Sequence, residues 1–177
     1  MEIRHYEKLT DQLLLEQIWE LLRRYNHAFI PPLSARENTY QSNLTDQQSI
    51  SNAEPVQYFE TLKQQSFIVA LDNNNQLLGF MSFRMNYICG DLEDNIDTIY
   101  ISTIIVDEAF RSKGVTTRFY AKMEEIARQE QRPITTRTWS TNNSHIHLLK
   151  KIGFTEALVI KNDRGINIDT VYFRKFV

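Results

Sequence analysis

The sequence predicts one domain of the α/β (α+β) class, in which about seven strands are interleaved with four helices. Four segments carry apolar residues at every third or fourth position, which is typical of amphipathic helices, whereas the segments between them alternate or are continuously apolar, as strands are. The 177 residues are 42% hydrophobic, which suffices for one compact core. Since no repeat, low-complexity tract or linker divides the chain, residues 1–177 are expected to fold as a unit.

The first third of the chain is expected to contain a strand, a helix and a long polar loop. Residues 2–9 predict a short strand. Residues 11–26 predict a helix that ends before Pro31 and whose apolar side chains share one face: Leu15, Ile18, Trp19, Leu22 and Tyr25. Residues 33–53 are rich in Ser, Asn and Gln, which predicts a long loop or a weakly helical lid.

The rest of the chain alternates between helices and strands. Helices are expected at 54–65, from 115 up to Pro133, and at 142–152, where Gly153 ends the last one. Strands are expected at 67–71, 77–87, 98–106, 134–139, 154–161 and 168–176. Polar turns at residues 72–75 and 163–165 connect the first two and the last two of these strands.

The segment 106–116 is the most informative part of the sequence. It joins a buried, β-branched strand to an amphipathic helix through a short basic loop that contains Gly114. The backbone N–H groups of residues 112–116 have no partners within that helix, and the positive end of the helix dipole lies beside them. With Arg111 and Lys113 in the same loop, this junction is predicted to bind phosphate.

Composition and charge disfavour several classes of function. The net charge of −2, the pI of about 6.1 and the scattered basic residues disfavour nucleic-acid binding. A single cysteine, Cys89, and four dispersed histidines form no zinc-binding pattern, so no metal is expected. The sequence has neither an apolar signal region nor a run of roughly 18 apolar residues. We therefore expect a cytoplasmic protein that binds no membrane.

Two motifs give the chain a resemblance to a known family. The motif Arg-x-x-Gly-x-Thr at 111–116 follows the fourth expected strand, and Asn142 precedes a helix that ends in Lys-Lys-Ile-Gly-Phe at 150–154. In this order of elements, essentially the whole chain resembles the GNAT superfamily of acyl-CoA-dependent N-acetyltransferases. The family usually has Gly or Ala in place of Thr116 and Tyr in place of Leu149, so the chain departs from the family pattern at both positions.

The resemblance implies a mixed, mostly antiparallel central sheet of about seven strands, with helices on both faces and a splay between strands 4 and 5. It also implies acetyl-CoA as co-substrate. The coenzyme A diphosphate would sit on the amides of 112–116, and the pantetheine arm would pair with the strand at 104–106. The predicted cofactor-binding residues are Ile104, Ile105, Val106, Arg111, Ser112, Lys113, Gly114, Val115, Thr116 and Asn142.

The expected reaction is the direct attack of a primary amine on the thioester. A backbone N–H of Ile105 or Val106 is placed to stabilise the oxyanion that forms, and proximity supplies much of the rate. An alkyl amine, with a pKa of about 10.4, arrives protonated and must first lose a proton. A base or a water chain is therefore required.

Three residues are predicted to act in catalysis: His145, Tyr100 and Asp97. Asp97, near the start of the central strand, is one of the nearest carboxylates for the base, and Tyr100 could line a water path with Ser102. His145 lies one helical turn before Leu149 and is the best substitute for the missing tyrosine acid. The acidic loop that precedes Asp97 could equally be a solvated surface.

The acceptor is expected to be a small-molecule or peptide amine, and the acidic segment 91–97 mildly favours a cationic one. Residues 26–53 are expected to cover its site. The alternative is a non-catalytic acyl-CoA-binding sensor or regulatory domain, which Leu149 and Thr116 favour, and a third possibility is an interaction protein that keeps only the fold. The sequence leaves open whether the protein is a monomer or a homodimer.

Overall fold

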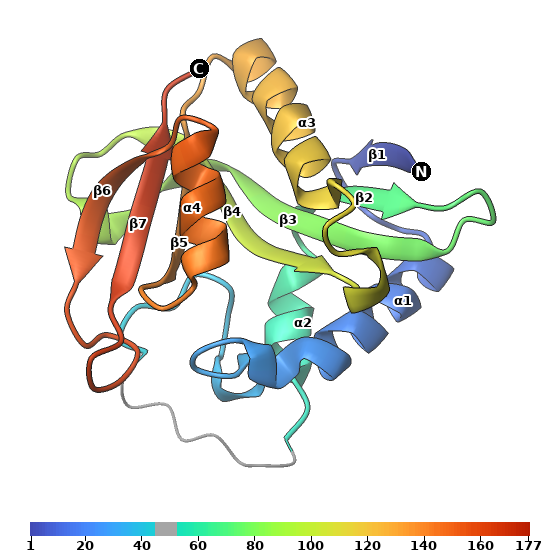
Figure 1. Ribbon diagram of the computed structural model, residues 1–177, viewed down its shortest axis with the longest axis horizontal. Coiled ribbons are helices and arrows are strands. Elements are labelled where there is room, and N and C mark those ends of the chain that lie inside the picture. Colours follow the sequence, from blue (N-terminus) through green and yellow to red (C-terminus); the bar gives the residue numbers. More distant parts are fainter. Residues whose placement is uncertain (45–52) are drawn as a thin grey trace.

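The computed structural model describes residues 1–44 and 53–177, which form one seven-stranded sheet with helices on both faces (Figure 1). The strands are β1 (Glu2–Tyr6), β2 (Ser66–Leu71), β3 (Leu77–Ile88), β4 (Asp97–Val106), β5 (Ile134–Trp139), β6 (Thr155–Ile160) and β7 (Thr170–Lys175). The helices are α1 (Gln12–Tyr25), α2 (Val56–Leu62), α3 (Val115–Glu130) and α4 (Asn143–Lys151). The strand order is β1-β2-β3-β4-β5-β7-β6.

The two faces of the sheet hold separate parts of the core. Strand β2 shows this division, because successive side chains of a strand point to opposite faces. Phe67 and Val69 belong to the cluster formed with α1 and α2, whereas Ile68 and Ala70 belong to the cluster formed with α3. All four side chains are fully buried. A strand covered on both faces must be apolar throughout, which explains the continuous apolar run in this part of the sequence.

The sheet is open at one place, between β4 and β5. Among the strands of residues 1–44 and 53–177, these two form the one parallel pair, and they pair only from Ile99 to Ile101 on the β4 side. Beyond this point β4 continues to Val106 and β5 continues to Trp139 without pairing to each other. The predicted fold class, a mixed and mostly antiparallel sheet splayed between strands 4 and 5, is therefore confirmed.

Most predicted elements are present with shifted ends. The first strand ends at Tyr6 instead of residue 9, and the second helix covers Val56–Leu62 instead of 54–65. Pro55 lies at the N-cap of that helix and, since it has no N–H, it is suited to a helix start. Of the predicted loop or lid, residues 45–52 lie outside the described residues.

Side-chain hydrogen bonds hold residues 26–44, the described stretch that follows α1, in which two short 3₁₀ turns occur at Asn26–Ala28 and Leu33–Ala35. The Asn26 amide donates to the Ser34 hydroxyl at 2.9 Å and accepts from the Ser34 N–H at 2.8 Å. Leu33 is fully buried beside them. These contacts fix an irregular segment against the sheet, next to the opening between β4 and β5.

Candidate active site

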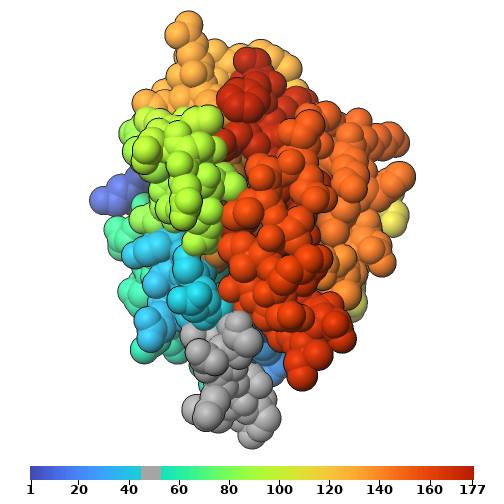
Figure 2. Space-filling view, turned by 90° about the vertical axis from the view of Figure 1, so that its left-hand side faces the viewer, coloured from blue at the N-terminus to red at the C-terminus, as the bar shows by residue number. Residues whose placement is uncertain are grey.

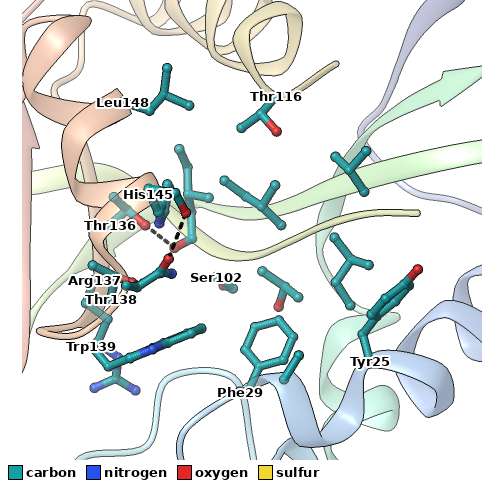
Figure 3. A pocket seen from close by; sticks show the side chains of 18 of the residues that line it. Tyr25, Phe29, Ser102, Thr116, Thr136, Arg137, Thr138, Trp139, His145 and Leu148 are labelled. Atoms are coloured by element: carbon teal, nitrogen blue, oxygen red, sulfur yellow. Dashed lines mark hydrogen bonds between the residues drawn. The ribbon is translucent and has the colours of Figure 1, made fainter. Parts of the chain in front are cut away.

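A cavity of about 540 Å³ occupies the opening between β4 and β5. The diverging ends of these strands, the loop before α3, the first turns of α4 and the end of α1 form its walls (Figure 3). The lining residues are Tyr25, Ala28, Phe29, Ile101, Ser102, Thr103, Ile104, Ile105, Val106, Arg111, Ser112, Thr116, Thr136, Arg137, Thr138, Trp139, Asn142, Ser144, His145 and Leu148. The cavity therefore connects the predicted phosphate loop to the segment that follows α1.

The loop before α3 presents unpaired backbone donors at one end of this cavity. Ser112 and Gly114 both have left-handed backbone conformations, with φ of 61° and 75°. Within the described ranges, the N–H groups of residues 112–117 donate to no protein acceptor, and the first helical bond runs from the Arg118 N–H to the Gly114 carbonyl at 3.1 Å. Consecutive free N–H groups at the positive end of a helix dipole form an anion-binding site.

Only one of the two basic side chains of this loop faces the cavity. Arg111 donates from Nε to the carbonyl oxygen of Val106 at 3.2 Å, and its guanidinium lies 4.9 Å from the ring centre of Tyr25. These contacts hold a positive charge at the edge of the cavity. The ammonium of Lys113 lies 4.9 Å from the ring centre of Phe110, and Lys113 does not line the cavity. The structure therefore brings Arg111, but not Lys113, to the predicted site.

The other predicted cofactor-binding residues line either this cavity or a smaller hollow beside it. Ile104, Ile105, Val106, Ser112, Thr116 and Asn142 line the cavity. Gly114 and Val115 line a neighbouring hollow of about 320 Å³ on the same loop. The Val115 side chain is part of the core and is 3% exposed, so it is chiefly the backbone N–H of this residue that a ligand could use.

The open edge of β4 offers backbone donors to the cavity. Asp107 donates its N–H to the carbonyl oxygen of Leu78 at the end of β3, at 3.0 Å. Because backbone N–H groups alternate in direction along a strand, the N–H of Ile105 also turns toward β3, whereas those of Ile104 and Val106 turn toward the opening. The N–H of Val106 therefore fits the predicted oxyanion role better than that of Ile105.

Gly79 allows β3 to pack closely against the opposite, paired edge of β4. A β-carbon at Gly79 would lie 2.6 Å from the carbonyl oxygen of Ile105 and 2.9 Å from the Cα of Val106. We expect Gly79→Ala to displace β4 and to lower the free energy of unfolding by about 1–3 kcal/mol, as measured by urea denaturation. Gly90→Ala is the control, because a β-carbon there meets nothing within 4 Å. Equal losses of stability in the two variants would contradict this close packing.

Asn142 lies at the start of α4 and faces the cavity. It occupies the N-cap position, but its side chain makes no capping hydrogen bond to the helix. Instead its Nδ2 donates to the Thr138 hydroxyl at 3.1 Å. A purely structural role as a helix cap therefore does not account for this residue.

His145 lies on α4 at the side of the cavity (Figure 3). Its Nε2 lies 2.8 Å from the hydroxyl of Tyr120 on α3. Burial lowers the pKa of His145 to about 4, so the imidazole is neutral at physiological pH. Leu149, where the family usually has tyrosine, is fully buried in the core, whereas Leu148 lines the cavity. The imidazole of His145 is thus the titratable group of α4 that faces a ligand in the cavity.

The structure does not bring the other two predicted catalytic residues to the cavity. Asp97 is exposed at the first residue of β4, where it forms an ion pair with Arg132. Seven residues of extended strand, about 23 Å, separate it from Ile104. Tyr100 is 2% exposed, and burial raises its pKa to about 12. Neither residue lines the cavity, so neither is placed to take a proton from an amine there.

The acidic loop before β4 is engaged in contacts within the protein. Asp91 accepts hydrogen bonds from the Tyr172 hydroxyl at 2.5 Å and from the Ser42 hydroxyl at 3.1 Å. Asp94 forms an ion pair with Arg174. Among the residues that the structure describes, no Asp or Glu lines the cavity. The cavity therefore adds no support to the cationic acceptor that this loop favours.

Two side chains at the far end of the cavity, Phe29 and Arg137, are not predicted from the sequence. The ring of Phe29 faces that of Trp139 with 5.8 Å between ring centres (Figure 3). Arg137 lines the cavity from β5, and its side chain is only 6% exposed. Its position in a strand otherwise made of Ile, Thr and Trp is a usable signal, because buried cations are rare. Phe29 lies in an irregular segment and carries no such signal.

The sequence matches a protein-family model over most of its length. The model describes the acetyltransferase (GNAT) family, and it matches residues 16–154. The chain belongs to the GNAT family. The predicted resemblance to the GNAT N-acetyltransferases is therefore confirmed, and the splayed strands of the GNAT fold account for the cavity. No curated protein sequence matches the chain.

Solved structures of GNAT enzymes share this fold over almost the whole chain. The aminoglycoside 6′-N-acetyltransferase from Enterococcus faecium is 15% identical, with a TM-score of 0.68 and coverage of 99% of this chain and 96% of its own. Another aminoglycoside 6′-N-acetyltransferase, complexed with coenzyme A, is 15% identical, with a TM-score of 0.67 and coverages of 99% and 96%. An N-acetyltransferase from Staphylococcus aureus Mu50 is 20% identical, with a TM-score of 0.64 and coverages of 99% and 99%. At these identities the likeness shows the fold.

The described residues form neither a metal-binding cluster nor a membrane-spanning helix. Within 1–44 and 53–177, no group of three or more His, Cys, Asp or Glu side chains is arranged to hold a metal ion. No helix within those ranges is both long enough and apolar enough to span a membrane.

Proposed function

We propose that this GNAT protein transfers the acetyl group of acetyl-CoA to a primary amine by direct attack, without a covalent enzyme intermediate. The observation that carries this proposal is the cavity itself. It joins a loop of free N–H groups, at 112–117, to the open edge of β4. The diphosphate of coenzyme A needs the free N–H groups, and the amide-containing pantetheine arm that follows it needs the open strand edge. The two features lie in the same order along the cavity.

The cofactor would lie along the loop and the strand edge. Its diphosphate would accept hydrogen bonds from the N–H groups after Arg111, and the Thr116 hydroxyl, which lines the cavity, would add another donor. The threonine that departs from the family pattern is therefore compatible with phosphate binding. The pantetheine amides would pair with the backbone of Ile104 and Val106 as an added strand, and Asn142 would contact the arm from the α4 side.

In the reaction, the neutral amine nitrogen bonds to the thioester carbonyl carbon, the nitrogen loses one proton to water, and the C–S bond breaks. The sulfur leaves as a thiolate, which takes up a proton from water. The N–H of Val106 would donate to the carbonyl oxygen as it becomes an oxyanion. His145 is neutral, so it would act by donating a hydrogen bond from its other ring nitrogen to the departing sulfur. It would not act as a charged acid.

The amine would lose its proton to water, because no carboxylate of the described residues lines the cavity. The cation of Arg137 in the cavity wall favours this loss, since a nearby positive charge lowers the pKa of an ammonium group. Ser102 also lines the cavity, and its hydroxyl has no partner within the described part of the chain, so it could hold such a water.

The proposed enzyme would act in the cytoplasm on a small-molecule or peptide amine, as a monomer or a homodimer. The single cysteine, which is free and buried, supports a reducing compartment. The modest net charge supports neither nucleic acid nor membrane as a partner.

Thiol release tests this function. The protein is mixed with acetyl-CoA, a thiol reagent and a panel of amines, and release of free CoA is followed. We expect release that depends on the amine and a product heavier than the amine by one acetyl group. Acetyl-CoA binding without release for any amine would contradict the enzyme and support the acyl-CoA sensor. Failure to bind acetyl-CoA would contradict both.

A further inference from the structure

Three buried arginines meet behind the far end of the cavity. Arg36 lies in the segment between α1 and α2, Arg137 on β5, and Arg164 in the loop between β6 and β7. Arg36 and Arg164 both donate to the carbonyl oxygen of Ile30, at 3.3 Å and 2.6 Å. Two guanidinium groups that share one acceptor must lie close to each other. Arg36 and Arg164 are 8% and 6% exposed as residues, so the surrounding protein excludes most of the water from them.

The segment that follows α1 lies at the surface in Figure 2. In that view it lies below the acidic loop before β4 and beside the region of β6. Two contacts fasten Arg137 beneath it, because its guanidinium donates to the carbonyl oxygen of Gln41 at 2.5 Å and to the hydroxyl of Tyr172 at 3.1 Å. The cluster is thus formed by segments that are distant in the sequence.

Two carboxylates lie near the three guanidinium groups, those of Asp91 and of the buried Asp163, which is linked to Arg164 through the Thr170 hydroxyl, so the positive charge of the cluster is only partly compensated. The carboxylate nearest to Arg137 is that of Asp91, at 4.0 Å. Arg36 has no carboxylate within ion-pair distance in the described part of the chain, and its partners are the carbonyl oxygens of Ile30 and Pro31. Burial, and secondarily the positive charge of Arg137, lower the pKa of Arg36 to about 10. Gathering like charges away from water costs stability, so an incoming negative group would be favoured here.

The cluster reaches the cavity through Arg137. This side chain lines the cavity, and only two of its five N–H groups have hydrogen-bond acceptors among the described residues. Trp139, whose ring lies 5.9 Å from the Arg164 guanidinium, lines the same wall and faces Phe29. An anionic group could therefore contact Arg137, while an apolar part of the same molecule contacts the two aromatic rings.

We propose that the acceptor is an amino acid or a similar small amine that carries a carboxylate, and that Arg137 binds this carboxylate. Arg36 and Arg164 act as positioning residues that supply positive potential from behind it. The inference rests on the proposed function, since it names the substrate class of the same cavity. It replaces the cationic acceptor favoured by the acidic loop, because the cavity is lined by arginines and, in the described residues, by no carboxylate.

Matched pairs of acceptors test this inference. Rates are measured at saturating acetyl-CoA for methionine and methioninamide, for phenylalanine and phenylalaninamide, and for a diamine. We expect kcat/KM for the acid to exceed that for its amide by about 100-fold or more. The amine of the amide is the less basic of the two, so the ionisation of the amine cannot produce this preference. Equal use of acid and amide, or a preference for the diamine, would overturn the proposal.

Variants of Arg137 distinguish binding of the acceptor carboxylate from a purely structural role of this side chain. In Arg137→Met we expect the ratio of kcat/KM for the acid to kcat/KM for its amide to fall to about 1, while the affinity for acetyl-CoA is retained. In Arg137→Lys we expect a ratio between those of Arg137→Met and the wild type. Arg84→Met is the control, because Arg84 lies over the Tyr40 ring at 4.2 Å and outside this cavity. An unchanged ratio in Arg137→Met would contradict the assignment.

Calorimetry with the protein–CoA complex distinguishes failure of this inference from failure of the proposed function. If no amine is turned over, the acid should still bind the complex more tightly than the amide, and the enzyme proposal alone is contradicted. If the amide binds as tightly as the acid, the carboxylate site is contradicted whether or not turnover occurs. Should Arg137→Met fail to fold, the acid and amide acceptors measured with the wild type and with Arg137→Lys test whether Arg137 binds the carboxylate.

Discussion

Replacing Gly114 with tryptophan is expected to abolish the binding of acetyl-CoA while leaving the fold intact. A β-carbon at Gly114 meets nothing within 4 Å, so a larger side chain would occupy open space above the loop instead of the protein core. That space is where the diphosphate would lie. Loss of two or more charge-assisted hydrogen bonds should raise the Kd by at least about 100-fold, as measured by calorimetry.

Gly114→Ala is the matched control for this variant. The φ of 75° at Gly114 strains any other residue, by about 1–2 kcal/mol, so both variants should lose a similar amount of stability. Only the tryptophan has the bulk to displace a phosphate. If Gly114→Ala and Gly114→Trp bind acetyl-CoA equally well, the diphosphate does not lie on this loop.

Replacing His145 with alanine is expected to lower kcat by about 100-fold while the affinity for acetyl-CoA changes little. The imidazole lines the cavity where the sulfur would depart, and at neutral pH it has an N–H to donate. Tyr120→Phe is the control, because it removes the hydroxyl bound to Nε2 and keeps the imidazole. Its kcat should fall less than that of His145→Ala. Equal losses would indicate that the pair acts only through packing.

The pH dependence gives a second test of His145. Its pKa is lowered from 6.5 to about 4, so no group should titrate near pH 6.5 in the kcat profile of the wild type, and the rate should rise with pH as more amine becomes neutral. Between these two pKa values the unfolded chain binds more protons than the folded one. The stability that this group contributes is therefore present above pH 6.5 and is lost as the pH falls toward 4. An inflection near pH 6.5 that disappears in His145→Ala would contradict the neutral imidazole.

The parts of the fold and site that are local in sequence were predictable. The apolar run of β4, the basic loop and the periodic helix lie within residues 97–130, so composition and spacing describe the phosphate loop directly. The sequences of β4 and β5 do not indicate that these strands pair over only three residues. The family resemblance implies only that these strands are splayed, and the structure confirms that splay.

Contacts between distant segments were not predictable. Asp97 is the first residue of β4, which spans Asp97–Val106, whereas the cavity lies at the other end of this strand. Closeness in sequence to the central strand therefore did not place the carboxylate at the cavity. Tyr120 meets His145 across two helices, a contact that no periodicity encodes. The arginine cluster combines an irregular segment, a strand and a hairpin loop. Only the buried position of Arg137 within its strand marks that cluster in the sequence.

A crystal structure of the protein with acetyl-CoA tests the central claim most directly. We predict diphosphate oxygens within hydrogen-bond distance of the backbone N–H groups of residues 112–117, and the thioester carbonyl oxygen at the N–H of Val106. The pantetheine arm should run along the open edge of β4. A cofactor bound elsewhere on the molecule, or a diphosphate that leaves those N–H groups unused, would contradict the proposed acetyltransferase site.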